Sequence, residues 1–383
     1  MTTAYGIEVF QSDRQHWMTA LSGAVAEELE DIGLHRTVNA VVTESTWTGD
    51  APAVGVYLGS AGTVADARLG ARISTAVGAG MVITPVVESL SRFAQDVPAI
   101  LAPLNGFEWN GPGSARRLAR LLLENLGIED RDRKVFISHK REDGLGAAEQ
   151  LHDQLSHAGF HPFIDRFAIR KGERVQETIA DALEDHAFLL LLETPLAHTS
   201  DWVFDEVDYA LSHTMGTLIL RWPGAPKPVP GSPGVPRLEV LDSELVKDEH
   251  GFDVFTPPAL DRIIGAVEAS HAHGLIRRRR MLVGSIEEAA IASGCTSCLP
   301  LPHWRVRVDR DEGPTIVGIT PRLPTATDLQ QLDQAREALT PDSAALLVHS
   351  ARALSAERRE YLEWVSGPRE LALIPENAIG GWW

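Results

Sequence analysis

The amino-acid sequence predicts an α/β fold built on doubly wound parallel sheets. Over most of its 383 residues, short apolar runs rich in β-branched residues alternate with segments whose apolar residues recur every three or four positions. The runs are apolar throughout, as strands are when both faces of a parallel sheet are covered. Parallel connections need crossovers, so we expect the periodic segments to be helices on both faces of each sheet.

The chain divides into three blocks, and the first, residues 1–128, is expected to form an α/β domain. Its expected strands are Ile7–Phe10, Val38–Thr43, Val54–Leu58 and Met81–Thr84. We expect Pro85 to stop the last of these strands. Its expected helices are Trp17–Ile32, Val64–Val77 and Leu118–Leu126.

The second block, residues 129–274, repeats the alternation. Its expected strands are Val135–Ser138, Pro162–Asp165, Ala187–Leu192 and Thr217–Leu220. Its expected helices are Ala148–Leu155, Val175–Leu183, Val203–Leu211 and Leu260–Val267. A proline-rich loop, Pro223–Pro236, precedes the last helix.

The third block, residues 275–383, carries no catalytic motif and is expected to be an α/β domain for sensing or assembly. Its expected strands are Trp304–Val308, Thr315–Ile319, Ala344–His349 and Leu371–Ile374, with a turn at Asp311–Gly313 between the first two. Its expected helices are Leu329–Leu339 and Ala356–Val365. The pair Trp382–Trp383 is expected to dock on a core or a subunit interface.

Composition excludes several classes of function. The formal net charge is −18, which argues against nucleic acid as the main partner because phosphate backbones are repelled. No run of 18 apolar residues is present, and the first ten residues do not resemble a signal peptide, so neither a membrane partner nor secretion is expected. With only two cysteines, the chain fits the reducing cytoplasm.

Two local patterns leave alternatives open. The basic run Arg277–Arg280 fits a phosphate or partner contact, a solvated helix face or a domain junction. Cys295 and Cys298 have His303 nearby, but a zinc site normally needs a fourth ligand, so no metal is expected and structural cysteines are favoured over a redox pair.

Four features of the second block occur in a specific order. The segment Val135–Asp143 reads as a strand that ends in a small hydroxyl residue before a polar loop. The segment Gly159–Gly172 places Asp165 at a strand end before a long loop. The strand Ala187–Leu192 runs into Glu-Thr-Pro, and Ser200–Glu206 reads Ser-Asp-Trp-Val-Phe-Asp-Glu.

Together these features resemble the Toll/interleukin-receptor (TIR) family of the bacterial type, over residues 129–274. Ser200, Trp202 and Glu206 match the family's Ser-x-Trp-x-x-x-Glu, which is the most specific part. The resemblance implies a flavodoxin-like domain. The first block looks like a diverged relative of the same fold, but it has no Trp-x-x-x-Glu, so such a unit would lack the catalytic glutamate.

TIR proteins include adaptors that only assemble and enzymes that cleave NAD, so the resemblance implies an NAD glycohydrolase with Glu206 as catalytic residue. Cleavage of the nicotinamide–ribose bond develops positive charge on the ribose, which a neighbouring carboxylate stabilises. Trp202 lies four residues earlier on the same expected helix, so both side chains share a face and the indole can wall the substrate pocket.

Further substrate-binding residues are expected where strands end, because ligands of such folds bind beyond the carboxyl ends of the strands. Ser138, His139 and Lys140 lie at the end of one strand. Asp165, Arg166 and Phe167 lie at the end of the next. We expect Lys140, Arg141 or Arg166 to meet the pyrophosphate and Phe167 to stack on a base.

The resemblance also implies biological context. Many similar bacterial proteins act in antiphage defence and are activated by self-association, so we expect NAD as substrate without a separate cofactor, a homo-oligomer, and an activating ligand or partner. Two other functions stay open: a TIR scaffold without activity, and a nucleoside deoxyribosyltransferase-like enzyme or nucleotide N-glycosidase.

Overall fold

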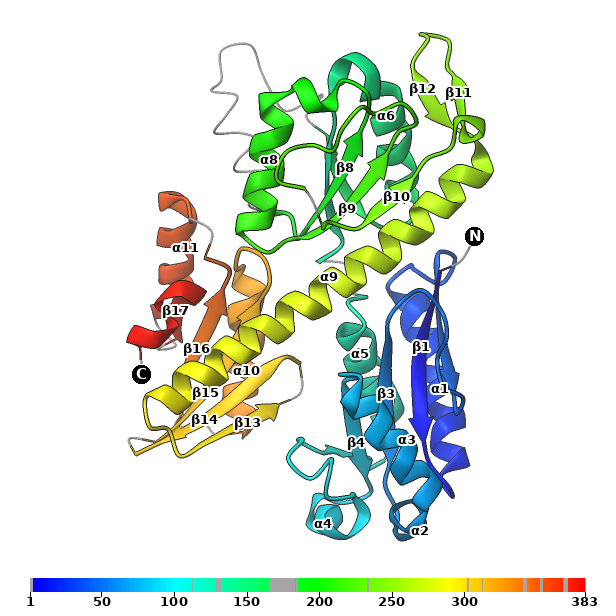
Figure 1. Ribbon diagram of the computed structural model, residues 1–383. Helices are drawn as coiled ribbons and strands as arrows, with labels where there is room; N and C mark the ends of the chain where they lie inside the picture. The colour runs from blue at the N-terminus through cyan, green and yellow to red at the C-terminus, as the bar shows by residue number, and fades with distance from the viewer. Residues whose placement is uncertain are drawn as a thin grey trace.

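The computed structural model describes residues 3–111, 113–128, 132–164, 183, 185–232, 234–301, 303–311, 313–339, 343–351, 354–367 and 371–382. Within these residues the chain forms three five-stranded sheets and a two-stranded hairpin, and one long helix contacts all three sheets (Figure 1). The helices and strands of the first sheet occupy the lower right of Figure 1, those of the second the top, and those of the third the lower left.

The first sheet is parallel throughout, with strand order β2-β1-β3-β4-β5. Its strands are β1 (Thr3–Phe10), β2 (Val38–Thr43), β3 (Ala53–Leu58), β4 (Ile83–Val87) and β5 (Phe107–Glu108). Its helices are α1 (Gln15–Asp31), α2 (Ala61–Ala65), α3 (Ala67–Gly78), α4 (Phe93–Asp96) and α5 (Ser114–Asn125), with a 3-10 turn at Leu90–Arg92. The strands and helices expected in this block are therefore confirmed, with two corrections.

The first correction concerns the single helix expected over Val64–Val77, which is two helices. Asp66 separates them, and its carboxylate accepts hydrogen bonds from the backbone amides of Arg68 and Leu69. This capping starts α3 afresh, because the side chain satisfies amides that have no partner inside the helix.

The second correction concerns Pro85, which does not stop its strand: β4 runs through it to Val87. The carbonyl of Val86 faces β3 and that of Val87 faces β5, so alternate residues point to opposite neighbours. The backbone nitrogen of Pro85 therefore points toward β5, and β5 pairs only with Val86 and Val87. A missing amide hydrogen is tolerated there because no ladder bond is lost.

The second sheet is also parallel, with strand order β10-β9-β8-β6-β7. Its strands are β6 (Lys134–Ser138), β7 (His161–Ile164), β8 (Phe188–Glu193), β9 (Gly216–Arg221) and β10 (Arg237–Glu239). Its helices are α6 (Arg141–His157), a 3-10 turn at Ala197–Thr199, and α8 (Asp201–Ser212). A hairpin of β11 (Leu245–Lys247) and β12 (Asp253–Phe255) follows a 3-10 turn at Asp242–Glu244. Most of the helix expected over Val175–Leu183 lies outside the described residues.

The first two sheets share one strand order, in which the second strand in sequence lies outside the first and the third to fifth follow on the other side. This order is that of flavodoxin-like folds. It agrees with a first block built like the second, although a diverged TIR unit there stays a proposal.

The third sheet is mixed. Strands β13 (Ser297–Leu301), β14 (Arg305–Arg310) and β15 (Gly313–Thr320) are antiparallel, and β16 (Ala344–His349) and β17 (Leu371–Pro375) continue in parallel. Helices α10 (Ala326–Leu339), α11 (Ala356–Ser366) and a 3-10 turn at Glu376–Gly381 complete it. Its expected strands and helices are confirmed, and β13 is an addition that the sequence did not indicate. Trp382 packs on the core of this sheet, as expected.

Helix α9 (Pro257–Ala292) is far longer than the expected helix at Leu260–Val267. Successive stretches of it are buried in different cores. The segment 259–267 belongs to the core of the second sheet, Ala272 to that of the first, and the segment 282–290 to that of the third. It therefore runs through residue 274, where the sequence suggested a boundary; the division into domains at 128 and 274 stays a prediction.

A buried carboxylate on α9 joins the first and second sheets. Glu268 pairs with Arg133 at 2.6 Å and accepts a hydrogen bond of 2.6 Å from the Tyr5 hydroxyl. Burial opposes the charge of Glu268, but the Arg133 guanidinium outweighs it, so the pKa of this carboxyl is below its usual value. The pKa of Tyr5 is raised by burial and by Glu268.

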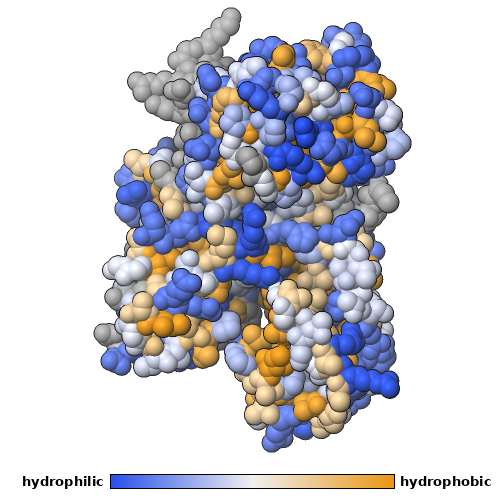
Figure 2. Space-filling model, viewed as in Figure 1, coloured by the Kyte–Doolittle hydropathy of each residue, from blue (hydrophilic) through white to orange (hydrophobic). Residues whose placement is uncertain are grey.

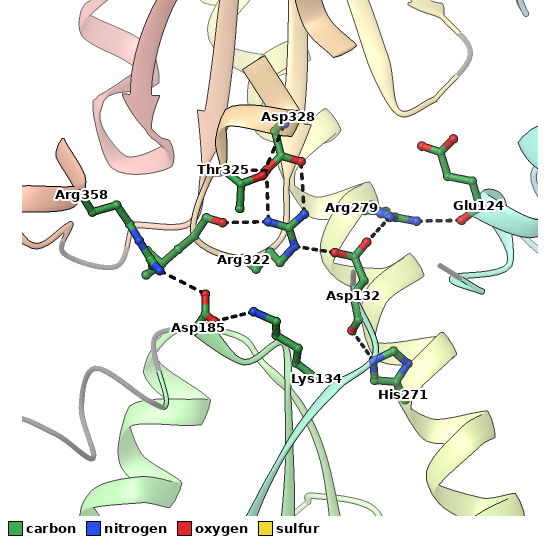
Figure 3. A network of polar contacts seen from close by, with 11 residues as sticks. Glu124, Asp132, Lys134, Asp185, His271, Arg279, Arg322, Thr325, Asp328 and Arg358 are labelled. Carbon is green, nitrogen blue, oxygen red and sulfur yellow. Dashed lines mark hydrogen bonds and ion pairs between the residues drawn. The ribbon is translucent and has the colours of Figure 1, made fainter. Parts of the chain in front are cut away.

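Asp132 is the centre of a second buried cluster, which joins α9 to the third sheet (Figure 3). Its carboxylate accepts from Arg279 and from Arg322, both at 2.7 Å, and its carbonyl accepts from His271 Nε2 at 2.8 Å. Alongside, Asp185 pairs with Lys134 and, at 3.5 Å, with Arg358 of α11. The residues before and at the start of β6 thus link the second sheet to α9 and to the third sheet. Each five-stranded sheet with its helices is called a unit below.

Of the alternatives left open for the basic run Arg277–Arg280, the contacts of its side chains support a junction between parts of the chain. Arg278 pairs with Glu376 at 2.7 Å, Arg279 with Asp132, and Arg280 donates to the carbonyl of Gly80. Arg278 and Arg279 are buried rather than solvated. Because Arg278, Arg279 and Arg280 each reach a different partner, these three residues of the run tie α9 to the first and third units.

The two cysteines lie free and half-buried at the core of the third sheet. Burial, with Glu287 nearby, raises the pKa of the Cys298 thiol to about 11. A thiol with such a pKa is mostly protonated at neutral pH and is a poor nucleophile. Among the described residues, no group of three His, Cys, Asp or Glu side chains could hold a metal ion.

Candidate functional site

The order in which strands are added to the second sheet reverses direction between β6 and β8, and the candidate site lies at the carboxyl ends of these two strands. From β6 the chain passes to β7 on one side, and β8 pairs with β6 on the other. Helices leave such neighbouring strands in opposite directions, and in open α/β sheets ligands bind in the crevice beyond such a point.

Ser138 ends β6 beside this crevice, as the sequence predicts. Its side chain is buried, and its hydroxyl makes no hydrogen bond within the described part of the chain. A buried hydroxyl without a partner costs free energy, so its presence is better explained by a polar ligand than by packing.

His139 and Lys140 follow at the same edge. The imidazole of His139 is half-buried, with Nδ1 3.5 Å from the Ile137 carbonyl, and Gly144 packs close to it. Lys140 precedes the first turn of α6, and its Nζ lies 3.3 Å from Glu142. The other three expected binding residues, Asp165, Arg166 and Phe167, lie outside the described residues.

The loop after β8 is fixed to the start of α6. Asp143 accepts a hydrogen bond of 2.7 Å from the Thr194 hydroxyl and one of 2.8 Å from the Leu196 amide. This loop leads into α8, so the contact positions the first turn of α8 relative to the end of β6. Asp143 appeared in the sequence only as a polar loop residue, and no spacing pattern distinguished it.

Glu193 is a second carboxylate at this edge that sequence reasoning missed. It is buried at the end of β8, accepts from the Val229 amide at 2.8 Å, and pairs with Arg237 at 3.4 Å. These contacts hold the proline-rich loop over the sheet. Its partners come from distant segments, so the sequence showed it only as the first residue of Glu-Thr-Pro after an apolar run, without a role.

Glu206 lies in the middle of α8 and is only 5% exposed. Its neighbours Val203 and Val207 are part of the core between α8 and the sheet. Trp202, one turn earlier, is 41% exposed. The glutamate is therefore buried against the body of the domain, while the indole lies at its surface near the start of the helix.

Tyr209 and His213 continue the line of Trp202 and Glu206 along α8, at helical spacings of three and four residues. Their rings stack with centroids 4.1 Å apart, and His213 Nδ1 lies 2.8 Å from the Tyr209 carbonyl. This aromatic pair was not singled out in the sequence, although its spacing from Glu206 is the signal that could have found it.

A family model described as a TIR domain matches residues 135–251. This part of the chain is a TIR domain. The match begins at the second residue of β6 and includes α6, β8, α8 and β9, so it contains Ser138, Trp202 and Glu206.

The comparisons with whole proteins are sparser. No curated protein matches the chain. Among solved structures, the TIR domains of the activated Roq1 resistosome, which directly recognizes the pathogen effector XopQ, match with 18% identity and a TM-score of 0.22. That match covers 23% of this chain and 57% of the other. None of the described helices has both the length and the hydropathy that a transmembrane helix needs.

Proposed function

We propose that the TIR domain is an NAD glycohydrolase that releases nicotinamide and forms ADP-ribose or its cyclic form. The observation that supports this most directly is the burial of Glu206 on α8. This helix follows β8, one of the two strands between which the strand order reverses. Carboxylates are seldom buried without a reason, and one held near a ligand crevice is a candidate catalytic group.

The chemistry needs a negative charge beside the ribose. As the bond to nicotinamide breaks, positive charge develops on the ribose, and a fixed carboxylate stabilises it more strongly in a water-excluded site than in water. Glu206 supplies that charge. Nicotinamide leaves as a neutral amine, so the residue need not protonate the leaving group.

The other residues position the substrate. Trp202 walls the site, and Ser138 offers a hydroxyl without a protein partner. His139 and Lys140 supply polar and cationic groups for the pyrophosphate, and Asp165, Arg166 and Phe167 remain proposed binding residues. No separate cofactor is needed, because NAD is the substrate.

We further propose that the chain is an effector in bacterial antiphage defence, active as a homo-oligomer in the cytoplasm and turned on by a ligand or partner. The reason is that the TIR domain is joined to two further α/β units without a known catalytic motif, through the buried Tyr5–Glu268 hydrogen bond and the buried Arg322–Asp132 ion pair. Those units are the natural place for a trigger to act.

The test is NAD consumption by the full chain at high protein concentration. We expect Glu206→Gln to lower the rate at least a hundredfold, because the neutral amide keeps the shape and loses the charge. Asp208→Asn, an exposed position on the same helix, is the control and should keep full activity. Equal activity of all three proteins would show that Glu206 is not the catalytic residue.

The same assay distinguishes the alternatives. Free nucleosides and nucleotides offered in place of NAD identify a deoxyribosyltransferase-like enzyme or a nucleotide N-glycosidase. A self-associating protein that cleaves none of these substrates in any activated state is a scaffold.

A further inference from the structure

The first and third units enclose a cleft that the TIR domain does not contribute to. Figure 2 shows a hollow between the two lower lobes of the molecule. The turn between β13 and β14, which carries His303, Trp304 and Arg305, lies over α5 and borders hollows on both of its sides.

On one side the hollow is apolar and has a volume of about 290 Å³. Its walls come from α3 and β4 of the first unit, from Val283 of α9, and from Pro300 and Leu301 of β13. An apolar pocket of this size accepts a flat ring system.

On the other side the hollow is larger, at about 950 Å³, and charged side chains line it beside apolar ones. The charged side chains are three arginines, Arg117 and Arg120 of α5 and Arg305 of β14, and two glutamates, Glu28 and Glu124. Arg305 also donates to the carbonyl of Gln331 at 3.3 Å. Arg120 pairs with Glu28 at 2.7 Å. Arg117 is exposed; it hydrogen-bonds to Asn110 and Ser114 and forms no ion pair within the described residues.

The turn between the two hollows has a strained backbone. His303 and Trp304 have φ angles of 62° and 51°, in the left-handed region that side chains other than glycine rarely adopt. Such strain clusters at ligand sites. His303 forms an ion pair with Glu124, which holds the turn against α5.

Trp304 also has a hydrogen-bond donor for which the described residues offer no acceptor. Its indole Nε1 is buried and has no hydrogen-bond acceptor within the described residues. Since buried indole N–H groups usually find a partner, the donor is available for a ligand that enters the cleft.

We propose that this cleft binds a small organic phosphate of nucleotide size. The flat ring occupies the apolar hollow beside Trp304, and the phosphate groups meet Arg117 and Arg305. A chain with a net charge of −18 repels anions in general, so a partly apolar cleft whose three arginines outnumber its two glutamates selects for an anion that also carries a ring.

The test is isothermal titration calorimetry of ADP against the full chain carrying Glu206→Gln, which prevents turnover at the TIR domain. We expect Arg117→Gln and Arg305→Gln each to weaken ADP binding about fivefold, and the double variant at least tenfold, because a phosphate contact is lost each time. The control is Arg68→Gln, an exposed arginine of α3 outside the cleft, which should leave the affinity unchanged.

Adenosine and inorganic phosphate are titrated separately, because each represents one part of the proposed ligand. We expect each to bind at least tenfold more weakly than ADP. The proposal is overturned if ADP does not bind, if the double variant binds ADP as tightly as its parent, or if phosphate alone binds as well as ADP. Arg117 is exposed, so its substitution does not disturb a core, and circular dichroism verifies that each variant is folded.

Discussion

Buried charge in this molecule is concentrated at the amino end of β6, where Asp132 and Arg133 are almost fully enclosed. The proposed catalytic Glu206 lies on α8, the helix that follows the opposite, carboxyl end of β8 in the same sheet. Charges removed from water stabilise a fold only when they are well paired, and here both residues meet two or more partners.

His271 makes this region sensitive to acid. Burial, together with the charge of Arg133, lowers its pKa to about 4. In the unfolded chain its pKa is about 6.5. Between these values the unfolded chain binds a proton that the folded chain does not, so the free energy of unfolding falls as the pH falls, by about 1.4 kcal/mol per pH unit.

Urea unfolding at several pH values between 7.5 and 4.5 checks this prediction. The variant His271→Gln keeps a hydrogen-bond donor but cannot titrate, so its stability should depend less on pH over this range. His250→Gln, at an exposed site, should keep the slope of the parent protein. An unchanged slope in His271→Gln would assign the acid sensitivity to other groups.

At the residue scale, the sequence identified candidate site residues only where a short motif or a strand end points to them. Ser-x-Trp-x-x-x-Glu marked Trp202 and Glu206, and a strand end marked Ser138. Asp143 and Glu193 escaped because their partners, Leu196 and Val229, lie more than thirty positions away, and no local pattern encodes such pairs.

Helix α9 is the element whose extent the sequence concealed. Its inward-facing positions after Val267 include Glu268, His271, Arg278 and Arg279, so the apolar period stops although the burial continues. The central strands were easier to predict, since β3, β4 and β8 are mainly apolar runs between polar loops. The helix also passes through three cores in succession, which shifts its buried face along the way.

Close packing of α9 against β9 gives a prediction for this element. A Cβ on Gly274 would lie 2.8 Å from the Cα of Gly216, and backbone cannot move aside as a flexible side chain can. We expect Gly274→Ala to lower the free energy of unfolding by about 1–3 kcal/mol.

Gly284 is the matched control on the same helix, because a Cβ there meets nothing within 4 Å. Gly284→Ala should raise stability by up to about 1 kcal/mol through helix propensity. Thermal and urea unfolding of both variants measure the difference. Equal stability of the two variants would mean that α9 does not approach β9 this closely.

At the scale of the whole molecule, Asp132 is the carboxylate on which the three units depend. It neutralises both Arg279 and Arg322 within the buried cluster of Figure 3. We expect Asp132→Asn to lower the free energy of unfolding by about 3–5 kcal/mol, because two buried guanidinium groups lose their shared counter-charge.

Differential scanning calorimetry checks this, together with limited proteolysis of α9. The parent chain should unfold in one main transition, whereas Asp132→Asn should release the third unit at lower temperature. Asp311→Asn, in an exposed turn, is the control. A single unshifted transition in Asp132→Asn would show that the cluster does not hold the units together.

The sequence predicted three α/β blocks and their order, but not how they meet. The run Arg277–Arg280 left a solvated face and a junction as alternatives, since four arginines in a row have no side-chain period that distinguishes them. Only the positions of Glu376, Asp132 and Gly80 decide it, and these are distant in sequence.

The shared helix also has a consequence for dissecting the protein. The matched TIR segment ends at residue 251, before α9 begins at Pro257, yet Leu260, Ile263 and Val267 belong to the core of its sheet. A fragment cut at the family boundary leaves Phe188 and Leu218 of the sheet uncovered and is prone to aggregate. The smallest piece that keeps the core of this sheet covered must therefore carry the first three turns of a helix that the family pattern does not include.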